Sequence, residues 1–181
     1  MDLVSVPLLL VSGPPGVGKT AVAWEIFDLL VAQGDCPAVA DLDLLGAQWP
    51  VPDDDPHNER LKAANLGAIW ANFRAAGSRC LIAAGVIENH DLQRTYTEVI
   101  PGAHATLCTL RAEDADLRQR IIHRGREKAD RIDKLAARAA ELSHHFDTHD
   151  LGGISIQTDN RDIPTVARSV LNQAGGWPRS G

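Results

Sequence analysis

Residues 13–20 read Gly-Pro-Pro-Gly-Val-Gly-Lys-Thr and match the pattern G-x-x-x-x-G-K-[ST] in full. The glycines let consecutive backbone N–H groups converge on one anion, and a helix that begins directly behind them adds a partial positive charge. In this pattern the lysine reaches the β- and γ-phosphates, and the hydroxyl residue ligates Mg²⁺. We therefore expect a nucleoside triphosphate to bind at Gly13, Pro14, Pro15, Gly16, Val17, Gly18, Lys19 and Thr20.

The flanking sequence has the strand-loop-helix order that this loop requires. Residues 8–12 form an apolar run that is typical of a strand buried on both faces. Residues 21–31 have the composition of a helix, and Gly34 is a suitable end for it. The alternative is a glycine-rich turn in an unrelated strand-to-helix connection, which this context disfavours.

Length and composition predict a single domain. The chain has 181 residues, and we expect one folded unit over residues 1–174 and a disordered tail over residues 175–181. No apolar run reaches the length of about 18 residues that spans a membrane. Residues 3–11 follow no basic stretch, so they predict a strand and not a signal peptide, and we expect a cytoplasmic protein that is a monomer or homodimer.

The charge and the cysteines exclude other classes. The formal net charge is −6, which argues against a nucleic-acid partner bound mainly through its phosphates. Cys36, Cys80 and Cys108 form no C-x-x-C pair, so a disulfide framework is not expected.

Two carboxylates mark a second part of the expected site. Residues 38–43 predict a short strand that ends in Asp41 and Asp43. Ligands of parallel sheets bind beyond the carboxyl ends of the strands, and residues two apart point to the same side. One acid would support Mg²⁺ and the other would accept a proton from a substrate hydroxyl, and the spacing does not decide which. The strand predicted at 80–85 ends without an acid, which makes Asp41 and Asp43 stronger candidates for the carboxylates of the site.

The remaining chain alternates helices and strands, which is typical of an α/β protein. We expect helices over residues 57–76, 91–99, 114–126, 128–145 and 164–173, and strands over residues 80–85, 103–110 and 154–157. This order predicts a three-layer α/β sandwich, with a five-stranded parallel sheet of order 2-3-1-4-5 and helices on both faces.

Arginines gather after the fourth predicted strand, around Gly125. Their planar guanidinium groups on a mobile segment could close over phosphates and stabilise transferring charge, and we expect one or two of them to be functional. The others are expected to form pairs on the helix surface. The cluster comprises Arg118, Arg120, Arg124 and Arg126.

With these features placed, residues 6–173 resemble the small P-loop kinases of the shikimate, gluconate and adenylylsulfate kinase type. The resemblance rests on the phosphate loop, Asp41-Leu42-Asp43 in place of a D-x-D motif, the arginine-bearing segment and residues 158–162. It implies ATP and Mg²⁺ as cofactors, a short lid over residues 118–135, and a small molecule as phosphate acceptor.

The resemblance also implies roles for individual residues. Asp41 matches the acid on the magnesium side, and Asp43 matches the substrate-binding acid and base. Arg60 and Arg138 are similar in position to arginines that hold an anionic substrate, and Gly85 lies where the backbone approaches the substrate. The nucleotide-side arginines are Arg120 and Arg161 beside the adenine, and Arg124 or Arg126 in the lid.

The third strand ends in Ala83-Ala84-Gly85 where shikimate kinases have a glycine triplet, so shikimate is not the expected acceptor. The helix from His57 is more similar to uncharacterised small kinases that include antibiotic phosphotransferases. We therefore expect transfer of the ATP γ-phosphoryl group to a small-molecule hydroxyl. The alternatives are a nucleoside or nucleoside monophosphate kinase, with Trp49, Trp70 and Phe73 around a base, and a slow ATPase that acts as a switch.

Overall fold

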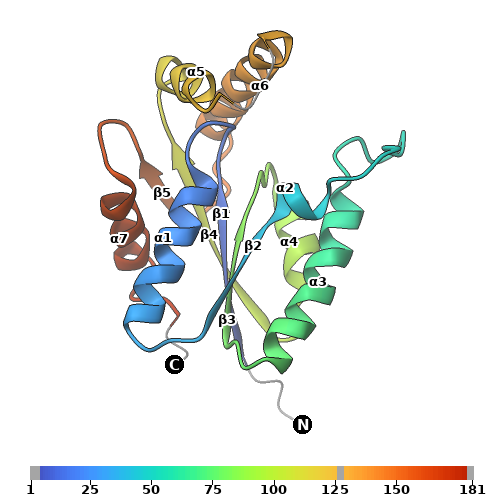
Figure 1. Cartoon of the computed structure of the whole chain (residues 1–181), viewed down its shortest axis with the longest axis vertical. Helices are drawn as coiled ribbons and strands as arrows, with labels where there is room; N and C mark the ends of the chain where they lie inside the picture. The colour runs from blue at the N-terminus through green and yellow to red at the C-terminus, as the bar shows by residue number, and fades with distance from the viewer. Residues whose placement is uncertain (1–4, 126–128, 179–181) are drawn as a thin grey trace.

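The structure is a computed structural model that describes residues 5–125 and 129–178. Strands and helices alternate along most of the chain, as the sequence predicted (Figure 1). The strands are β1 (Val6–Ser12), β2 (Pro37–Asp41), β3 (Cys80–Ala84), β4 (Ala103–Arg111) and β5 (Ile154–Gln157). The helices are α1 (Lys19–Ala32), α2 (Leu42–Leu45), α3 (Glu59–Ala75), α4 (His90–Glu98), α5 (Asp114–His123), α6 (Ala129–Thr148) and α7 (Ile163–Gln173).

The strands form one parallel sheet in the order β2-β3-β1-β4-β5, which confirms the predicted topology. The central strand β1 pairs with β3 on one side and with β4 on the other. Every residue of β1 and β3 is buried, because helices cover both faces of a parallel sheet. The phosphate loop, which follows β1, therefore begins at the carboxyl end of the central strand of the sheet.

The helices cover the sheet in two layers, α1 with α7 on one face and α3 with α4 on the other (Figure 1). Alternate residues of β1 point into the two cores: Leu9 packs with the α1 layer, and Leu8 packs with the α3 layer. Trp70 and Tyr96 fill the second core and are at most 2% exposed. No helix among the described residues has the length and hydropathy needed to cross a bilayer.

The second strand is shorter than predicted. It ends at Asp41, and the short helix α2 follows directly, whereas the sequence predicted a strand through Asp43. The reason is a helix cap: the Asp41 carboxylate accepts hydrogen bonds from the backbone N–H groups of Asp43, at 3.0 Å, and Leu44, at 3.4 Å. Asp41 is therefore the N-cap of α2 and Asp43 lies in its first turn, so the expected strand alternation between the two acids is wrong.

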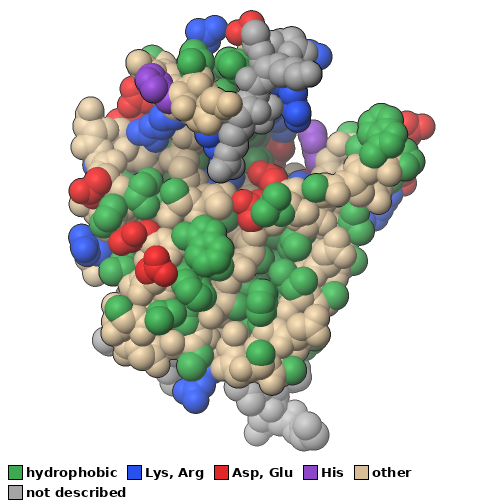
Figure 2. All heavy atoms as spheres, in the orientation of Figure 1, with side chains coloured by type: hydrophobic (Ala, Val, Ile, Leu, Met, Phe, Trp, Pro, Cys, Tyr) green, Lys and Arg blue, Asp and Glu red, His purple; other side chains and the backbone are tan. Residues whose placement is uncertain are grey.

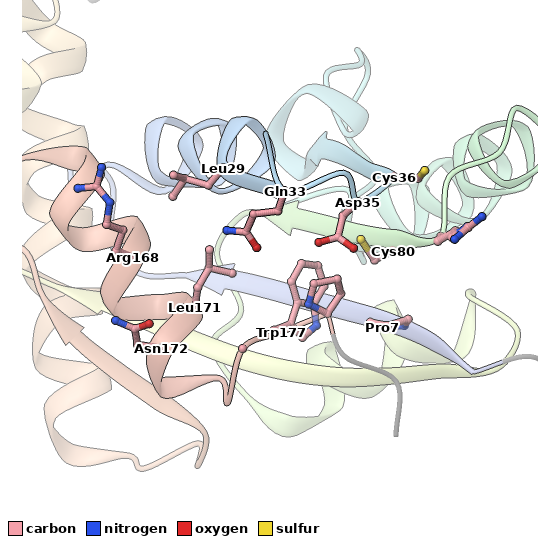
Figure 3. A pocket seen from close by; sticks show the side chains of 13 residues that line it. Pro7, Leu29, Gln33, Asp35, Cys36, Cys80, Arg168, Leu171, Asn172 and Trp177 are labelled. Carbon is pink, nitrogen blue, oxygen red and sulfur yellow. The ribbon is translucent and has the colours of Figure 1, made fainter. Parts of the chain in front are cut away.

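Of residues 175–181, which the sequence predicted to be a disordered tail, the structure describes residues 175–178. Trp177 is only 7% exposed and packs into the core that contains α1 and α7, so the segment through Pro178 folds back onto the sheet. A cavity of about 590 Å³ lies beside it, at the amino ends of the strands and far from the phosphate loop (Figure 3). Pro7, Cys80 and Trp177 are among its lining residues.

Replacing Trp177 by Ala should destabilise the protein by about 3 kcal/mol, because the change leaves a cavity in the core. Chemical denaturation measures this free energy of unfolding. Trp49 is 88% exposed and provides the matched control, since Trp49→Ala should change stability by less than about 0.5 kcal/mol. Equal effects of the two substitutions would mean that the segment after α7 does not pack as described.

Candidate active site

The phosphate loop joins β1 to α1 and requires its glycines. Gly13, Gly16 and Gly18 have φ angles of 141°, 86° and 101°, which side chains of L-residues rarely allow. A Cβ on Gly13 would lie 2.5 Å from the carbonyl oxygen of Leu110, so β4 leaves no room for a side chain. Gly18 is the N-cap of α1 and supplies no side-chain cap, which leaves the N-terminus of this helix suited to an anion.

Lys19 is folded back onto the loop. Its Nζ donates hydrogen bonds to the carbonyl oxygens of Gly13, at 2.9 Å, and Pro14, at 3.1 Å, and the residue is 8% exposed. Burial lowers the pKa of Lys19 to about 8, although the carboxylates of Asp43 and Asp41 act in the opposite direction. Arg124 and Lys62 lower this pKa further, which places both cations within electrostatic range of the loop.

Thr20 and Asp41 form the part of the site that fits Mg²⁺. The Thr20 hydroxyl donates a hydrogen bond of 2.8 Å to Oδ2 of Asp41, while Oδ1 of the same carboxylate caps α2. Mg²⁺ is usually held by one or two protein oxygens together with phosphate oxygens and water. These adjacent hard oxygens beside the phosphate loop are therefore suitable ligands for Mg²⁺, either directly or through water.

Asp43 lies in the first turn of α2 and faces the same cavity as the loop. Its side chain is 63% exposed, and its Oδ1 lies 3.9 Å from the Nζ of Lys62. The cavity has a volume of about 680 Å³, which is enough for a nucleotide and a small second molecule. Its lining residues are Pro15, Gly16, Gly18, Lys19, Thr20, Ala21, Asp43, Val86, Arg120, His123, Arg124, Arg131 and Leu135.

The arginines of the predicted lid separate into distinct groups. Arg120 donates to the hydroxyl of Thr158 at 2.9 Å and to its carbonyl at 3.2 Å, and it lines the cavity together with Arg124. Arg118 instead pairs with Asp133 of α6 at 3.1 Å. Arg126, which the sequence also predicted to be catalytic, lies outside the described residues.

Arg161 lies between the end of β5 and the middle of α7. Its guanidinium donates to the carbonyl oxygen of Gln157 at 3.1 Å and to the hydroxyl of Ser169. It does not line the 680 Å³ cavity. The structure therefore places Arg120 beside the expected nucleotide position and places Arg161 at the neighbouring loop.

The arginines expected on the acceptor side have carboxylate partners. Arg60 pairs with Asp54 at 2.8 Å, and its side chain is 63% exposed. Arg138 pairs with Glu88, and it lines a smaller cavity of about 200 Å³ on the face of α6. That cavity shares Arg131 and Leu135 with the larger one, so the two cavities lie side by side along α6.

Gly85 lies at the end of β3, where α2 packs closely against it. A Cβ on Gly85 would lie 2.7 Å from the side chain of Leu42. The glycine therefore allows α2, and Asp43 on it, to approach the sheet. This packing role differs from the direct substrate contact that the sequence predicted, which stays a prediction.

Sequence reasoning missed Lys62, Glu59 and Tyr96 behind Asp43. Lys62 Nζ donates a 2.9 Å hydrogen bond to Glu59, and the Tyr96 hydroxyl donates to the other oxygen of that carboxylate. The available signal was the helical spacing, because Lys62 lies on the same stripe of α3 as Leu66 and Trp70, which are buried. A lysine on such a stripe needs a buried partner.

The molecular surface is hollowed between the α5–α6 pair and the segment that leads into α3 (Figure 2). Basic and acidic side chains lie around this hollow, which opens toward the carboxyl ends of the strands (Figures 1 and 2). The phosphate loop, Asp41, Asp43, Arg120 and Arg124 therefore meet at the carboxyl ends of the strands.

Comparison with known proteins supports the fold. No protein-family model matches the chain, and no curated protein matches its sequence. A tunicamycin resistance protein from Deinococcus radiodurans matches with a TM-score of 0.65 and 20% identity, over 94% of this chain and 96% of that chain. A gluconokinase from Sinorhizobium meliloti 1021 matches with a TM-score of 0.64 and 17% identity, over 97% of this chain and 94% of that chain.

A shikimate kinase from Acinetobacter baumannii, solved in complex with shikimate, matches with a TM-score of 0.62 and 16% identity. It covers 98% of this chain and 97% of that chain. The chain therefore has the fold of the small P-loop kinases, which confirms the resemblance seen in the sequence at the level of the fold. At sequence identities of 20% or less, the similarity in fold does not identify the phosphate acceptor of this chain.

The affinity for ATP should fall as the pH rises from about 7 to about 9, because Lys19 must be protonated to bind phosphate and its pKa is about 8. Binding near pH 8.5 should then take up a fraction of a proton. Isothermal titration calorimetry with Mg²⁺ and AMPPNP, in buffers of different ionisation enthalpy, measures this uptake. Lys19→Met should remove it, and wild-type affinity that is constant over this pH range would contradict the assignment.

Proposed function

We propose that the protein is an ATP-dependent phosphotransferase that moves the γ-phosphoryl group to a hydroxyl of a small molecule. The observation that carries the proposal is the shared cavity, in which Asp43 faces Lys19 and Thr20 of the phosphate loop. A phosphate loop alone serves motors, switches and kinases. Transfer to a hydroxyl also needs a group that accepts the hydroxyl proton, and a carboxylate opposite the loop, on a separate short helix, can do so.

The donor half would be held by the loop. Backbone N–H groups of residues 13–20 would surround the β-phosphate, and Lys19 would exchange its contacts with the Gly13 and Pro14 carbonyls for phosphate oxygens. Mg²⁺, held near Thr20 and Asp41, would neutralise phosphate charge. Arg120 and Arg124 both line the cavity; Arg120 would contact the nucleotide, and Arg124 would contact the transferring group.

The acceptor half would be centred on Asp43. Its exposed carboxylate would accept the proton of the substrate hydroxyl while the hydroxyl oxygen attacks the γ-phosphorus. The expected lid over residues 118–135 would favour transfer over hydrolysis, because closure of α5 and α6 over the cavity would displace bulk water and make hydrolysis slow compared with transfer to a bound acceptor. Catalysis would come mainly from positioning and charge neutralisation.

The alternative functions have less support. Trp70, one of the aromatics considered for a nucleoside pocket, is buried in the core and 2% exposed, while Trp49 is 88% exposed. These aromatics therefore do not form the wall of a base pocket together. A nucleotide-dependent switch would need no carboxylate placed beside the phosphates, so the position of Asp43 also favours the kinase.

ATP consumption measured against a panel of hydroxyl compounds should identify an acceptor that accelerates turnover. The panel contains gluconate, shikimate, adenylylsulfate, nucleosides, tunicamycin and chloramphenicol. Lys19→Ala should abolish turnover and weaken ATP binding. Asp43→Asn should reduce kcat by about 10²-fold to 10⁴-fold and leave AMPPNP binding intact.

Glu98→Gln, at the exposed carboxyl end of α4, is a suitable control and should behave as the wild type. Full turnover by Lys19→Ala or by Asp43→Asn would contradict the proposed roles. A response of ATP turnover to a protein partner alone would favour the switch.

A further inference from the structure

Lys62 is a buried cation on the acceptor side of the cavity. It is 8% exposed, and its Nζ lies 2.9 Å from Oε1 of Glu59 and 3.9 Å from Oδ1 of Asp43. Its aliphatic stem packs so closely on Gly46 that a Cβ there would lie 2.7 Å from Cγ of Lys62. The ammonium group is therefore fixed both by packing and by charge.

Glu59 is held on several sides. The hydroxyl of Tyr96, which is fully buried, donates to Oε2 of Glu59, and Lys62 donates to Oε1. Burial and the Glu59 carboxylate raise the pKa of Tyr96, so its hydroxyl remains a donor. The backbone N–H of Glu59 also donates to the Asp55 carboxylate at 2.7 Å. Tyr96, Glu59 and Lys62 thus form a rigid chain of contacts that ends at Asp43.

Asp43 is less constrained by its own element. It lies on a four-residue helix, and its side chain is 63% exposed. The cation that the structure pairs with it, among the described residues, is Lys62. The separation of 3.9 Å is longer than a hydrogen bond, so the contact is electrostatic and leaves the oxygen lone pairs of Asp43 for a second partner.

We propose that Lys62 is a positioning residue that orients the Asp43 carboxylate toward the acceptor hydroxyl, with Glu59 and Tyr96 holding Lys62 in place. The inference rests on the proposed phosphotransfer and deepens it. In this arrangement Asp43 receives the proton of the acceptor hydroxyl, and the acceptor oxygen forms a new bond to the γ-phosphorus. The bond from the γ-phosphorus to the β–γ bridging oxygen breaks and ADP leaves, while Lys62 neither gains nor loses a proton. Lys62 therefore affects the rate through Asp43 and not through the nucleotide.

The test uses ATP turnover with water as the acceptor, so that no identified substrate is needed. Lys62→Met keeps the length of the side chain and removes the charge, and Lys62→Arg restores a cation. Lys62→Met should lower kcat about tenfold and leave the KM for ATP within about threefold, because only the placement of the attacking oxygen is lost. Lys62→Arg should recover most of the rate. Arg74→Met, an exposed cation in the last turn of the same helix, is the matched control and should change neither constant.

The double variant Asp43→Asn/Lys62→Met separates positioning from direct contact with phosphate. If Lys62 acts through Asp43, the double variant should be no slower than Asp43→Asn alone. The inference would be overturned if the losses in kcat of the two single variants multiplied in the double variant. A raised KM for ATP in Lys62→Met, or no rescue by Lys62→Arg, would overturn it as well. If a thermal melt shows that Lys62→Met does not fold, Glu59→Gln/Lys62→Met removes both charges of this ion pair and serves in the same comparison.

The two proposals fail in different ways. A wild-type rate for Lys62→Met, together with a slow Asp43→Asn, would overturn the role of Lys62 and leave the proposed phosphotransfer standing. Wild-type protein that hydrolyses no ATP and phosphorylates no acceptor would overturn the phosphotransfer, and with it the role of Lys62.

Discussion

The carboxylate of Asp41 joins the two halves of the site. One oxygen accepts the hydrogen bond of Thr20, at the end of the phosphate loop, and the other caps the helix that carries Asp43. The position of Asp43 relative to the loop therefore depends on one side chain at the end of β2. Leu42, packed against Gly85, holds the same helix down on the sheet. A donor site and an acceptor site are thus built on adjacent strand ends of a rigid sheet.

Buried charge is concentrated around this junction. Lys19 lies against the carbonyls of its own loop, and Lys62 lies between Glu59 and Asp43. Burying a cation is unfavourable unless partners compensate, and the low pKa of Lys19 shows that its compensation is incomplete. The negative charge of a bound phosphate would complete the compensation of the Lys19 charge. Lys62 already has two carboxylate partners, Glu59 and Asp43, so its charge stabilises the arrangement of side chains on the acceptor side.

Much of the fold could be predicted from the sequence. The uninterrupted apolar character of residues 8–12 and 80–84 predicts buried parallel strands, and the strand order follows from the way such units connect. The phosphate loop was equally predictable, because its glycines satisfy a backbone geometry that other residues rarely adopt. These features depend on local sequence and need no knowledge of distant contacts.

The parts that could not be predicted depend on tertiary contacts. The end of β2 at Asp41 is set by a side-chain cap that competes with continued strand. The burial of Trp177 depends on an apolar surface formed by α7, which directly precedes it, and by α1, which lies far from it in the sequence. Lys62 looks like a surface residue in the sequence, because Tyr96, the second donor to its partner Glu59, belongs to another helix, α4. Only the folded chain brings the two donors together around Glu59.

The central claim is that the phosphate loop and Asp43 form one phosphotransfer site. A crystal structure with Mg²⁺ and AMPPNP tests it most directly. The account predicts that the triphosphate lies along residues 13–20, that the Nζ of Lys19 leaves the Gly13 and Pro14 carbonyls for phosphate oxygens, and that Asp43 faces the γ-phosphate across a gap that fits a hydroxyl. Nucleotide bound elsewhere, for example in the cavity beside Trp177, or an Asp43 turned away from the γ-phosphate, would contradict it.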